Sequence, residues 1–430
     1  MSLDARPFEP GLPFALAMDG EDTLGPLREE FLFPSASNGG GRAVYLAGNS
    51  LGLQPRKAQA YITQELEDWA RFGVEGHLQA RRPWLPYHEQ LTEQMAAIVG
   101  AQPSEVVVMN TLTVNLHLMM VSFYRPTPGR YKIIMEAGAF PSDQYAVASQ
   151  VRFHGLKLGD AVVEVGPRAG EATVREEDLM AAIEREGASL SLVLMGNVNY
   201  LTGQAFDVAS ITRAGHAQGA LVGFDLAHGA GNLLLRLHQD GPDFAVWCSY
   251  KYLNGGPGSL AGCFVHERHA RSPSLPRFEG WWGHNKATRF QMERTFDPLP
   301  GAEGWQLSNP PIFQLAALRA SVELFAQATM ARLQAKSMRL TGYLDFLLTR
   351  LPAGFCIVVT PKQPEQRGAQ LSLRLNHPPK PLVRRLAEAG VVCDFREPDI
   401  IRVAPAPLYC NFEDVFRFVQ VLEKEVLSHG

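Results

Sequence analysis

The sequence predicts an α/β protein with a large domain built on a mainly parallel sheet and a smaller α+β domain after it. Between residues 105 and 265, short apolar runs alternate with amphipathic stretches, the pattern of a parallel sheet covered by helices on both faces. After about residue 352 the pattern changes to short strands and helices without that alternation. We therefore expect an N-terminal segment at residues 1–44, the large domain at 45–310, and a long helix with the small domain at 311–430.

Seven apolar runs of the large domain have the length and composition of buried strands. Helical periodicity separates several of them, most clearly in Arg175–Glu186 and Val208–Gln218. In such a sheet, ligands bind beyond the carboxyl ends of the strands, so residues after each strand are candidates for chemistry. The predicted strands are Glu105–Met109, Tyr131–Glu136, Ala161–Val165, Leu190–Gly196, Ala220–Asp225, Phe244–Cys248 and Leu260–Val265.

A long helical region follows the large domain. Asn309 is its predicted cap, because two prolines suited to a first helical turn come directly after it. Helical spacing continues to Leu347, with a bend expected at Thr341-Gly342. The elements expected in the small domain are the strands Cys356–Thr360, Gln370–Leu375, Val391–Phe395 and Ile400–Ala404 and the helices Lys380–Ala389 and Phe412–Val426.

Charge and composition exclude several classes of protein. A net charge of -4 and the lack of a basic stripe argue against general binding to nucleic acid or to anionic membranes. No run of about 18 apolar residues suits a membrane span. The five cysteines are scattered without a CxxC spacing, which is typical of a reducing compartment. We expect a cytoplasmic protein.

Two polar residues follow neighbouring predicted strands. Asp225 ends one strand, and a carboxylate there could keep the pyridine nitrogen of pyridoxal phosphate protonated. Lys251 follows the next strand, before a glycine-rich stretch, and burial would make its amine a nucleophile for imine formation. Each residue has an ordinary alternative, since an Asp often caps a turn and a Lys often lies on the surface. Together they favour a pyridoxal-phosphate site without settling it.

A phosphate group could bind where two helices are expected to begin, at Thr111–Thr113 and at Phe140–Asp143. Ordinary capping by Thr or Ser is the alternative for both segments. The pair His266 and His269 lacks the HExxH spacing, so we interpret it as a surface turn and predict no metal site.

These residues belong to a longer set of motifs that resembles the kynureninases, fold-type-I pyridoxal-phosphate hydrolases related to class V aminotransferases. The resemblance covers nearly the whole chain. The motifs most specific to the family are Gly280–His284, Ser308–Pro311 and Arg402–Tyr409. The other matching segments are Gly48–Gly52, Arg82–Trp84, Thr111–His117, Phe140–Asp143, Thr202–Gln204, Gly223–His228 and Trp247–Gly256.

The resemblance implies pyridoxal 5'-phosphate as cofactor, with Lys251 as the Schiff-base lysine and Asp225 beside the pyridine nitrogen. Phe140 would stack on the pyridine ring. Tyr250 is our candidate for the general acid and base of the later steps, because a phenol next to the lysine can reach both reacting carbons. The other implied cofactor-binding positions in the same subunit are Leu112, Thr113, Ser142, Asp143, His228 and Tyr250.

Further positions imply a homodimer with shared active sites. Trp281 and Asn309 match residues that reach the cofactor phosphate from the second subunit. Arg402 matches the residue that binds the substrate α-carboxylate, a task suited to a bidentate guanidinium. Near the aromatic ring of the substrate, the matching positions are His77, Ser308 and Asn309.

The implied reaction is hydrolysis of L-kynurenine or 3-hydroxy-L-kynurenine to an anthranilate and L-alanine, in tryptophan catabolism or NAD biosynthesis. Polar Ser308 and Asn309 slightly favour the hydroxylated substrate. One departure stands out, because Gly196 replaces a Ser or Thr that contacts the cofactor in the family. A cysteine desulfurase or selenocysteine lyase is the alternative enzyme, but Cys248 and Cys263 lie in predicted core strands. A cofactor-binding regulator would carry a basic DNA-binding module, which the sequence lacks.

Overall fold

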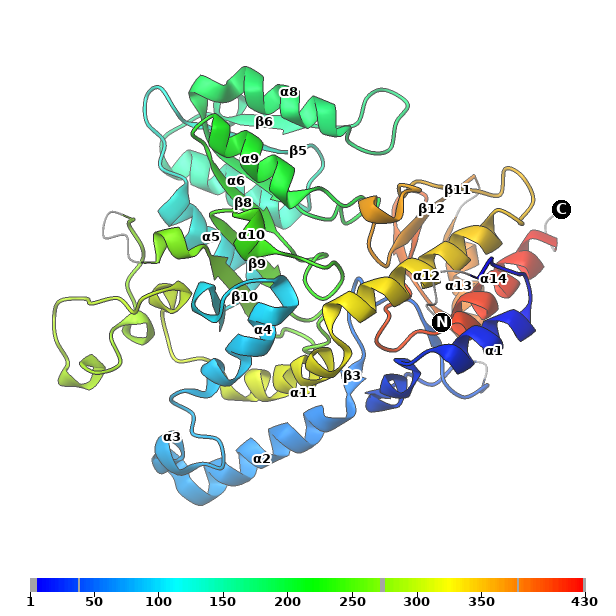
Figure 1. Cartoon of the computed structure of the whole chain (residues 1–430), viewed down its shortest axis with the longest axis horizontal. Helices are drawn as coiled ribbons and strands as arrows, with labels where there is room; N and C mark the ends of the chain where they lie inside the picture. Colours follow the sequence, from blue (N-terminus) through cyan, green and yellow to red (C-terminus); the bar gives the residue numbers. More distant parts are fainter. Residues whose placement is uncertain (1–5, 38, 271–274, 377–378, 428–430) are drawn as a thin grey trace.

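A seven-stranded sheet forms the centre of the large domain in the computed structural model, which describes residues 6–37, 39–270, 275–376 and 379–427. The strand order is β4-β10-β9-β8-β7-β5-β6 (Figure 1). Only β10 runs antiparallel to its neighbours β4 and β9, so the predicted mainly parallel sheet is confirmed. The strands are β4 (Val106–Met109), β5 (Lys132–Glu136), β6 (Val162–Val165), β7 (Leu190–Gly196), β8 (Leu221–Asp225), β9 (Phe244–Cys248) and β10 (Ala261–Val265).

Helices cover both faces of this sheet. Successive residues of a strand point to opposite faces, and since both sets are apolar here, both faces are buried under helices. In β4, Val106 and Val108 belong to one apolar core and Val107 and Met109 to the other. The first core includes α4 (Thr92–Val99), α8 (Glu176–Glu186), α9 (Val208–Ala217) and α11 (Ile312–Ala328). The second includes α5 (Leu112–Phe123) and α6 (Pro141–Phe153). Because all the strands except β10 run in one direction, their carboxyl ends lie at the same edge of the sheet.

The long helical region consists of two helices, α11 and α12 (Met330–Leu348). They are separated at Thr329, whose φ of 61° breaks the helical path. The bend predicted at Thr341-Gly342 is wrong, because Thr341 lies inside α12 and its hydroxyl donates to the Ser337 carbonyl. Asn309 is also not the cap: α11 begins after Pro311, and Asn309 is exposed.

The small domain carries an antiparallel sheet of four strands in the order β11-β12-β15-β14. The predicted strand Val391–Phe395 is in fact two strands, because β13 leaves this sheet and pairs in parallel with β2 of the N-terminal segment. Helix α1 lies beside α14 at the same end of the molecule (Figure 1). The elements are β11 (Cys356–Val358), β12 (Leu371–Leu375), α13 (Pro379–Glu388), β13 (Val391–Val392), β14 (Asp394–Arg396), β15 (Ile400–Val403), α14 (Phe412–Leu427), β2 (Val44–Tyr45) and α1 (Leu12–Glu21).

The remaining elements connect these two parts. Helix α2 lies along α11 beneath the large domain (Figure 1). Among the described residues, no helix combines the length and apolar character that crossing a membrane requires. These elements are β1 (Phe31–Leu32), β3 (Gln54–Pro55), α2 (Arg56–Phe72), α3 (Gly76–Gln79), α7 (Leu158–Ala161) and α10 (Leu237–Asp240), with short 3-10 turns between them.

Candidate active site

A pocket lies at the carboxyl edge of the central sheet, where β5, β7, β8 and β9 end. The strand ends Glu136, Gly196 and Asp225 line it, together with Lys251 after β9. Nine of the predicted site residues meet in this pocket, as expected for residues that follow parallel strands. They are Leu112, Thr113, Phe140, Ser142, Asp143, Asp225, His228, Tyr250 and Lys251.

The Lys251 side chain points into the middle of this group. Its Nζ lies 3.1 Å from Nε2 of His228 and 5.8 Å from the centre of the Phe140 ring. Burial lowers the pKa of His228 well below its usual range, and the positive charge of Lys251 adds to that effect. A neutral His228 can accept a hydrogen bond from the lysine and hold the amine in place.

Two carboxyl groups, Asp143 and Asp225, interact with each other in the same pocket as the lysine. Oδ1 of Asp225 accepts a hydrogen bond from the Ala227 backbone N–H at 2.6 Å. Burial raises the pKa of both groups, and the neighbouring charge of Asp225 raises that of Asp143 further. Asp143 therefore carries the proton and Asp225 the charge, because two buried carboxylates in contact do not both ionise. Among the residues that the structure describes, Oδ1 of Asp143 has no hydrogen-bond partner.

The first turns of α5 and α6 meet at the other side of the pocket. Their side chains Thr113 and Ser142 are joined by a hydrogen bond of 2.7 Å between the two hydroxyls. The cap residues Thr111 and Phe140 make no side-chain capping bond, so backbone N–H groups of the first turn of α5 stay available to a ligand. In the first turn of α6, Pro141 has no N–H and the Asp143 N–H donates to the Phe140 carbonyl, which leaves the N–H of Ser142. Two helix N-termini with adjacent hydroxyls form a site suited to a phosphate group.

Tyr250 stands beside the lysine, with the Lys251 Nζ 5.7 Å from the centre of its ring. Burial raises the pKa of Tyr250 above its usual value, and the nearby Cys248 raises it further. The phenol is therefore protonated and can donate to a group bound in the pocket.

Several lining residues were not predicted from the sequence. Glu136 is buried and lines the pocket, and burial raises its pKa to about 7. Asn199 and Tyr200, in the loop after β7, line it as well. The rule about strand ends also applies to Glu136, the last residue of β5, so this residue could have been found. The two loop residues carry no comparable signal.

Four predicted residues lie elsewhere: His77, Trp281, Ser308 and Asn309 do not line the pocket around Lys251, although the structure describes all of them. His77 is in α3, beyond the far end of α2 (Figure 1), and packs against Trp84. The other three are exposed.

Arg402 is also outside the pocket lining, on β15. Its guanidinium is buried, forms an ion pair with Asp394, and donates to the Tyr200 carbonyl at 2.7 Å. Its charge contributes to the low pKa of His228, so it lies near the pocket without opening into it. A substrate carboxylate would have to share this guanidinium with Asp394.

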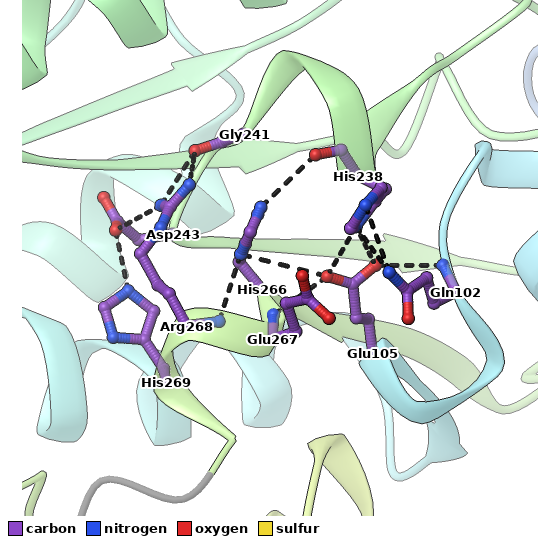
Figure 2. A network of polar contacts seen from close by, with 9 residues as sticks. All are labelled: Gln102, Glu105, His238, Gly241, Asp243, His266, Glu267, Arg268 and His269. Atoms are coloured by element: carbon purple, nitrogen blue, oxygen red, sulfur yellow. Dashed lines mark hydrogen bonds and ion pairs between the residues drawn. The ribbon is translucent and has the colours of Figure 1, made fainter.

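A second polar network lies at the opposite, amino-terminal edge of the sheet (Figure 2). It contains His266 and His269, which lie in a short 3-10 turn with Glu267 and Arg268 exposed, as predicted, but whose own rings are half-buried and hydrogen-bonded. His269 Nε2 bonds the buried Asp243 at 2.8 Å, and His266 Nε2 bonds the His238 carbonyl at 3.3 Å.

Glu105, His238 and His266 in this network are close enough together for their side chains to share a metal ion. Their ligand atoms are nevertheless already paired within the protein. Glu105 accepts from the backbone N–H groups of Gln102 and Glu267, and Nδ1 of His266 accepts from the Arg268 N–H. Nothing in this geometry requires an ion.

Comparison with known proteins places this geometry in a family. A family model described as the kynureninase C-terminal domain matches residues 333–422. The kynureninase of Myxococcus xanthus is 68% identical over 416 residues, which cover 97% of each chain. That of Koribacter versatilis is 58% identical over 416 residues, covering 97% of this chain and 98% of its own.

Solved structures share the fold at much lower identity. The cysteine desulfurase CsdA of Escherichia coli has a TM-score of 0.75 at 18% identity, covering 95% of this chain and 99% of its own. The cystine C-S lyase C-DES, in complex with its product cysteine persulfide, has a TM-score of 0.73 at 17% identity, covering 89% and 97%. These likenesses establish the architecture, whereas the full-length relatives establish the family. The chain belongs to the kynureninase family.

Proposed function

We propose that this protein is a pyridoxal-phosphate-dependent hydrolase that cleaves L-kynurenine, or its 3-hydroxy form, to anthranilate or 3-hydroxyanthranilate and L-alanine. The observation that carries the proposal is the Lys251 amine at 3.1 Å from a neutral His228, in a pocket that also holds a protonated Asp143 and a charged Asp225. This arrangement occurs in a chain 68% identical to a kynureninase over 97% of its length.

The pocket fits pyridoxal 5'-phosphate in its donor set. Lys251 would bind the aldehyde carbon, Asp225 the pyridine nitrogen, and the first turns of α5 and α6 the phosphate. The unpartnered buried atoms Asp143 Oδ1 and His228 Nδ1 are the kind of polar groups that a bound polar ring satisfies. When bound, this cofactor supplies an electron sink for the charge that develops at the substrate α-carbon.

The residues around the lysine have separate tasks in this proposal. The Lys251 amine takes the α-proton of the substrate, and the neutral His228 accepts a hydrogen bond from its Nζ and keeps it aligned. The phenol of Tyr250 is protonated and donates to the substrate carbonyl that water attacks. Arg402 binds the α-carboxylate and shares its guanidinium with Asp394.

The cysteine-dependent alternative is not favoured. Cys248 and Cys263 are buried in β9 and β10, and burial raises the pKa of both thiols. The half-buried Cys356 on β11 also has its pKa raised by burial, to about 11. A desulfurase needs an ionised, accessible thiolate as nucleophile. None of these cysteines provides one.

We also propose a homodimer in which the second subunit supplies Trp281, Ser308, Asn309 and His77 to each active site. All four lie outside the pocket of their own chain, and exposed apolar side chains surround two of them. An open, mainly apolar cavity of about 810 Å³ between α2, α11 and the segment that follows Lys251 gives a second copy a surface to cover. The exposed apolar residues near Trp281 are Phe278, Phe290 and Met292, and those near His77 are Val74 and Leu78.

Shared sites can be tested by mixing two inactive variants. Lys251→Ala damages a residue of one subunit, and Trp281→Ala damages a residue that serves the other. Hybrid dimers formed on coexpression contain one intact site, so activity should return to about a quarter of the wild-type value. If each site were built from one chain, no hybrid would be active. We place this dimer in the cytoplasm, where its five unpaired thiols would persist.

The activity itself is tested with purified holoenzyme given L-kynurenine, 3-hydroxy-L-kynurenine or L-cysteine. We expect anthranilate or hydroxyanthranilate fluorescence and no sulfide. Sulfide without either aromatic product would favour the desulfurase. Lys251→Ala should abolish the turnover together with the visible absorbance of the covalently held cofactor, and survival of that absorbance would contradict the placement of the lysine. A comparison of kcat/KM for the two kynurenines tests the preference for the hydroxylated one.

A further inference from the structure

Glu136 is a buried carboxyl group of the pocket for which the proposed chemistry has no task. It ends β5, next to the β7 strand of the same sheet, and only 4% of its surface is exposed. Its Oε1 accepts a hydrogen bond of 2.7 Å from Nδ2 of Asn199. A buried acid is costly to retain, so its interaction with Asn199 is a candidate for function.

Asn199 passes this interaction on to the loop that follows β7. Its other amide atom, Oδ1, accepts from the backbone N–H of Leu201 at 2.9 Å and from that of Thr202 at 2.7 Å. The backbone N–H of Asn199 also bonds the Gln204 carbonyl at 2.8 Å. Glu136 keeps an acceptor oxygen for Nδ2 of Asn199 whether or not it is protonated, so the bond fixes which end of the Asn199 amide faces the loop. Glu136 is thus connected through Asn199 to the turn 199–204, whose Tyr200 and Leu201 carbonyls also accept from Nε2 of Gln370 at 3.2 Å and 3.3 Å.

The same loop contacts both parts of the active site. The Tyr200 ring packs edge-on against Phe140, with ring centres 5.3 Å apart and an angle of 80° between the planes. The Tyr200 carbonyl accepts from Arg402 at 2.7 Å. The next carbonyl, of Leu201, accepts from the Ser372 hydroxyl of β12 at 2.6 Å. The loop therefore connects the ring-stacking side of the cofactor pocket with the sheet that carries Arg402.

We propose that Glu136 is a positioning residue: through Asn199 it holds the Tyr200 carbonyl that orients Arg402 towards the substrate carboxylate. The inference rests on the proposed function for the identity of Arg402 as the carboxylate-binding residue. The orientation of the Arg402 guanidinium is then fixed by Glu136, a carboxyl group of the large domain that does not contact the substrate. The effect should therefore appear in the binding of any L-α-amino acid to the holoenzyme, whether or not kynurenine is cleaved.

The test compares Glu136→Met with Glu136→Gln. Methionine fills a similar volume but removes the acceptor, whereas glutamine keeps an oxygen that Asn199 can reach. We expect the Kd of the holoenzyme for L-alanine, measured by calorimetry, to rise about tenfold in Glu136→Met and by much less in Glu136→Gln. The KM for L-kynurenine should rise in parallel while kcat changes less. The matched control is Glu164→Met, because Glu164 lies on the neighbouring strand β6 and is exposed.

A double-mutant cycle with Asn199→Ala separates this role from general support of the fold. If Glu136 acts through Asn199, the two losses should not add, and the double variant should bind L-alanine about as weakly as either single variant. Unchanged alanine binding in Glu136→Met would overturn the proposal, as would a loss of bound cofactor with normal alanine binding by the remaining holoenzyme. Should Glu136→Met fail to fold, Asn199→Ala interrupts the same connection and gives the same reading. A failure of the wild type to cleave kynurenine, with the alanine result intact, would count against the proposed function alone.

Discussion

Both edges of the central sheet contain buried carboxyl groups, but the two edges differ in how many hydrogen-bond donors surround these groups. At the amino-terminal edge, Asp243 accepts hydrogen bonds from His269 and Arg268 (Figure 2). It also accepts from His216 and from the Val222 backbone N–H. Burial alone would raise its pKa, but the hydrogen bonds from the two histidines and the backbone lower it below its usual range.

At the carboxyl edge the carboxyl groups are short of donors. Asp143 has an unpartnered oxygen, Asp225 accepts one backbone bond, and burial raises the pKa of both. A carboxylate with all its hydrogen bonds made within the protein stabilises the fold. One that lacks them reduces stability and is available to bind a ligand. The number of hydrogen-bond donors around a buried acid, rather than its burial, therefore separates a structural role from a functional one.

The largest effect is expected at the amino-terminal edge of the sheet, where Asp243→Asn should reduce the stability of the fold. This change removes a charge that several donors surround and leaves Arg268 without its carboxylate. We expect the free energy of unfolding of the apoenzyme to fall by about 3 to 5 kcal/mol. Urea unfolding followed by far-UV circular dichroism measures it. The kcat of the folded holoenzyme should stay within about twofold, and a large loss of kcat without destabilisation would contradict the structural assignment.

The matched change at the functional edge is Asp225→Asn, which should have the reverse profile. We expect kcat/KM for L-kynurenine to fall on the order of 10³-fold, about 4 kcal/mol, because a fixed charge beside the cofactor is lost. The apoenzyme should be no less stable than the wild type, since a buried acid with few donors is removed. Near-normal turnover would show that Asp225 does not serve the cofactor.

The pH dependence of stability gives a third test. Burial raises the pKa of Glu136 from an ordinary 4.5 to about 7, so the folded apoenzyme holds this proton more tightly than the unfolded chain. This tighter proton binding stabilises the folded apoenzyme by about 3 kcal/mol below about pH 4.5. The stabilisation is lost as the pH rises to about 7. In Glu136→Gln, this part of the decline between pH 5 and pH 8 should disappear. Identical pH profiles for the two proteins would show that the carboxyl group is not desolvated as described.

The smallest effect is expected from Gly196→Ser, which adds a donor to the donor-poor edge. A Cβ at Gly196 would meet only the Val198 carbonyl, at 3.8 Å, so the pocket has room for a serine. One added hydrogen bond of about 1 kcal/mol should tighten cofactor binding about fivefold. Reconstitution of the apoenzyme with increasing pyridoxal phosphate measures this, and weaker binding would show that the hydroxyl does not reach the cofactor.

The sequence predicted the sheet and most of the pocket, because both depend on local patterns. Apolar runs mark strands, and the rule that ligands bind at strand ends led to Asp225 and Lys251. The same rule, applied to the strand that ends at Glu136, would have added a further residue. The break at Thr329 had no such signal, since neither Gly nor Pro marks it.

Contacts between distant parts of the chain were not predictable in this way. His269 was interpreted as part of a surface turn because its partner, Asp243, is 26 residues away in the sequence. The ion pair of Arg402 with Asp394 depends on the register of β14 against β15, which the sequence does not reveal. The positions of Trp281 and Asn309 depend on a second subunit in the dimer that we propose. The domain boundaries at residues 44 and 310 remain predictions.

The pairing of β2 with β13 has a consequence for how the protein is made. Helix α1 and strand β2, within residues 12–45, pack against elements that lie beyond residue 390. During translation they must wait for more than 300 residues before their partners β13 and α14 leave the ribosome. A fragment that begins after residue 310 contains α14 but lacks α1 and β2. We therefore expect this fragment to expose the apolar side of α14 and to aggregate. The segment that contains α1 and β2 thus gains its partners only after most of the large domain has been made.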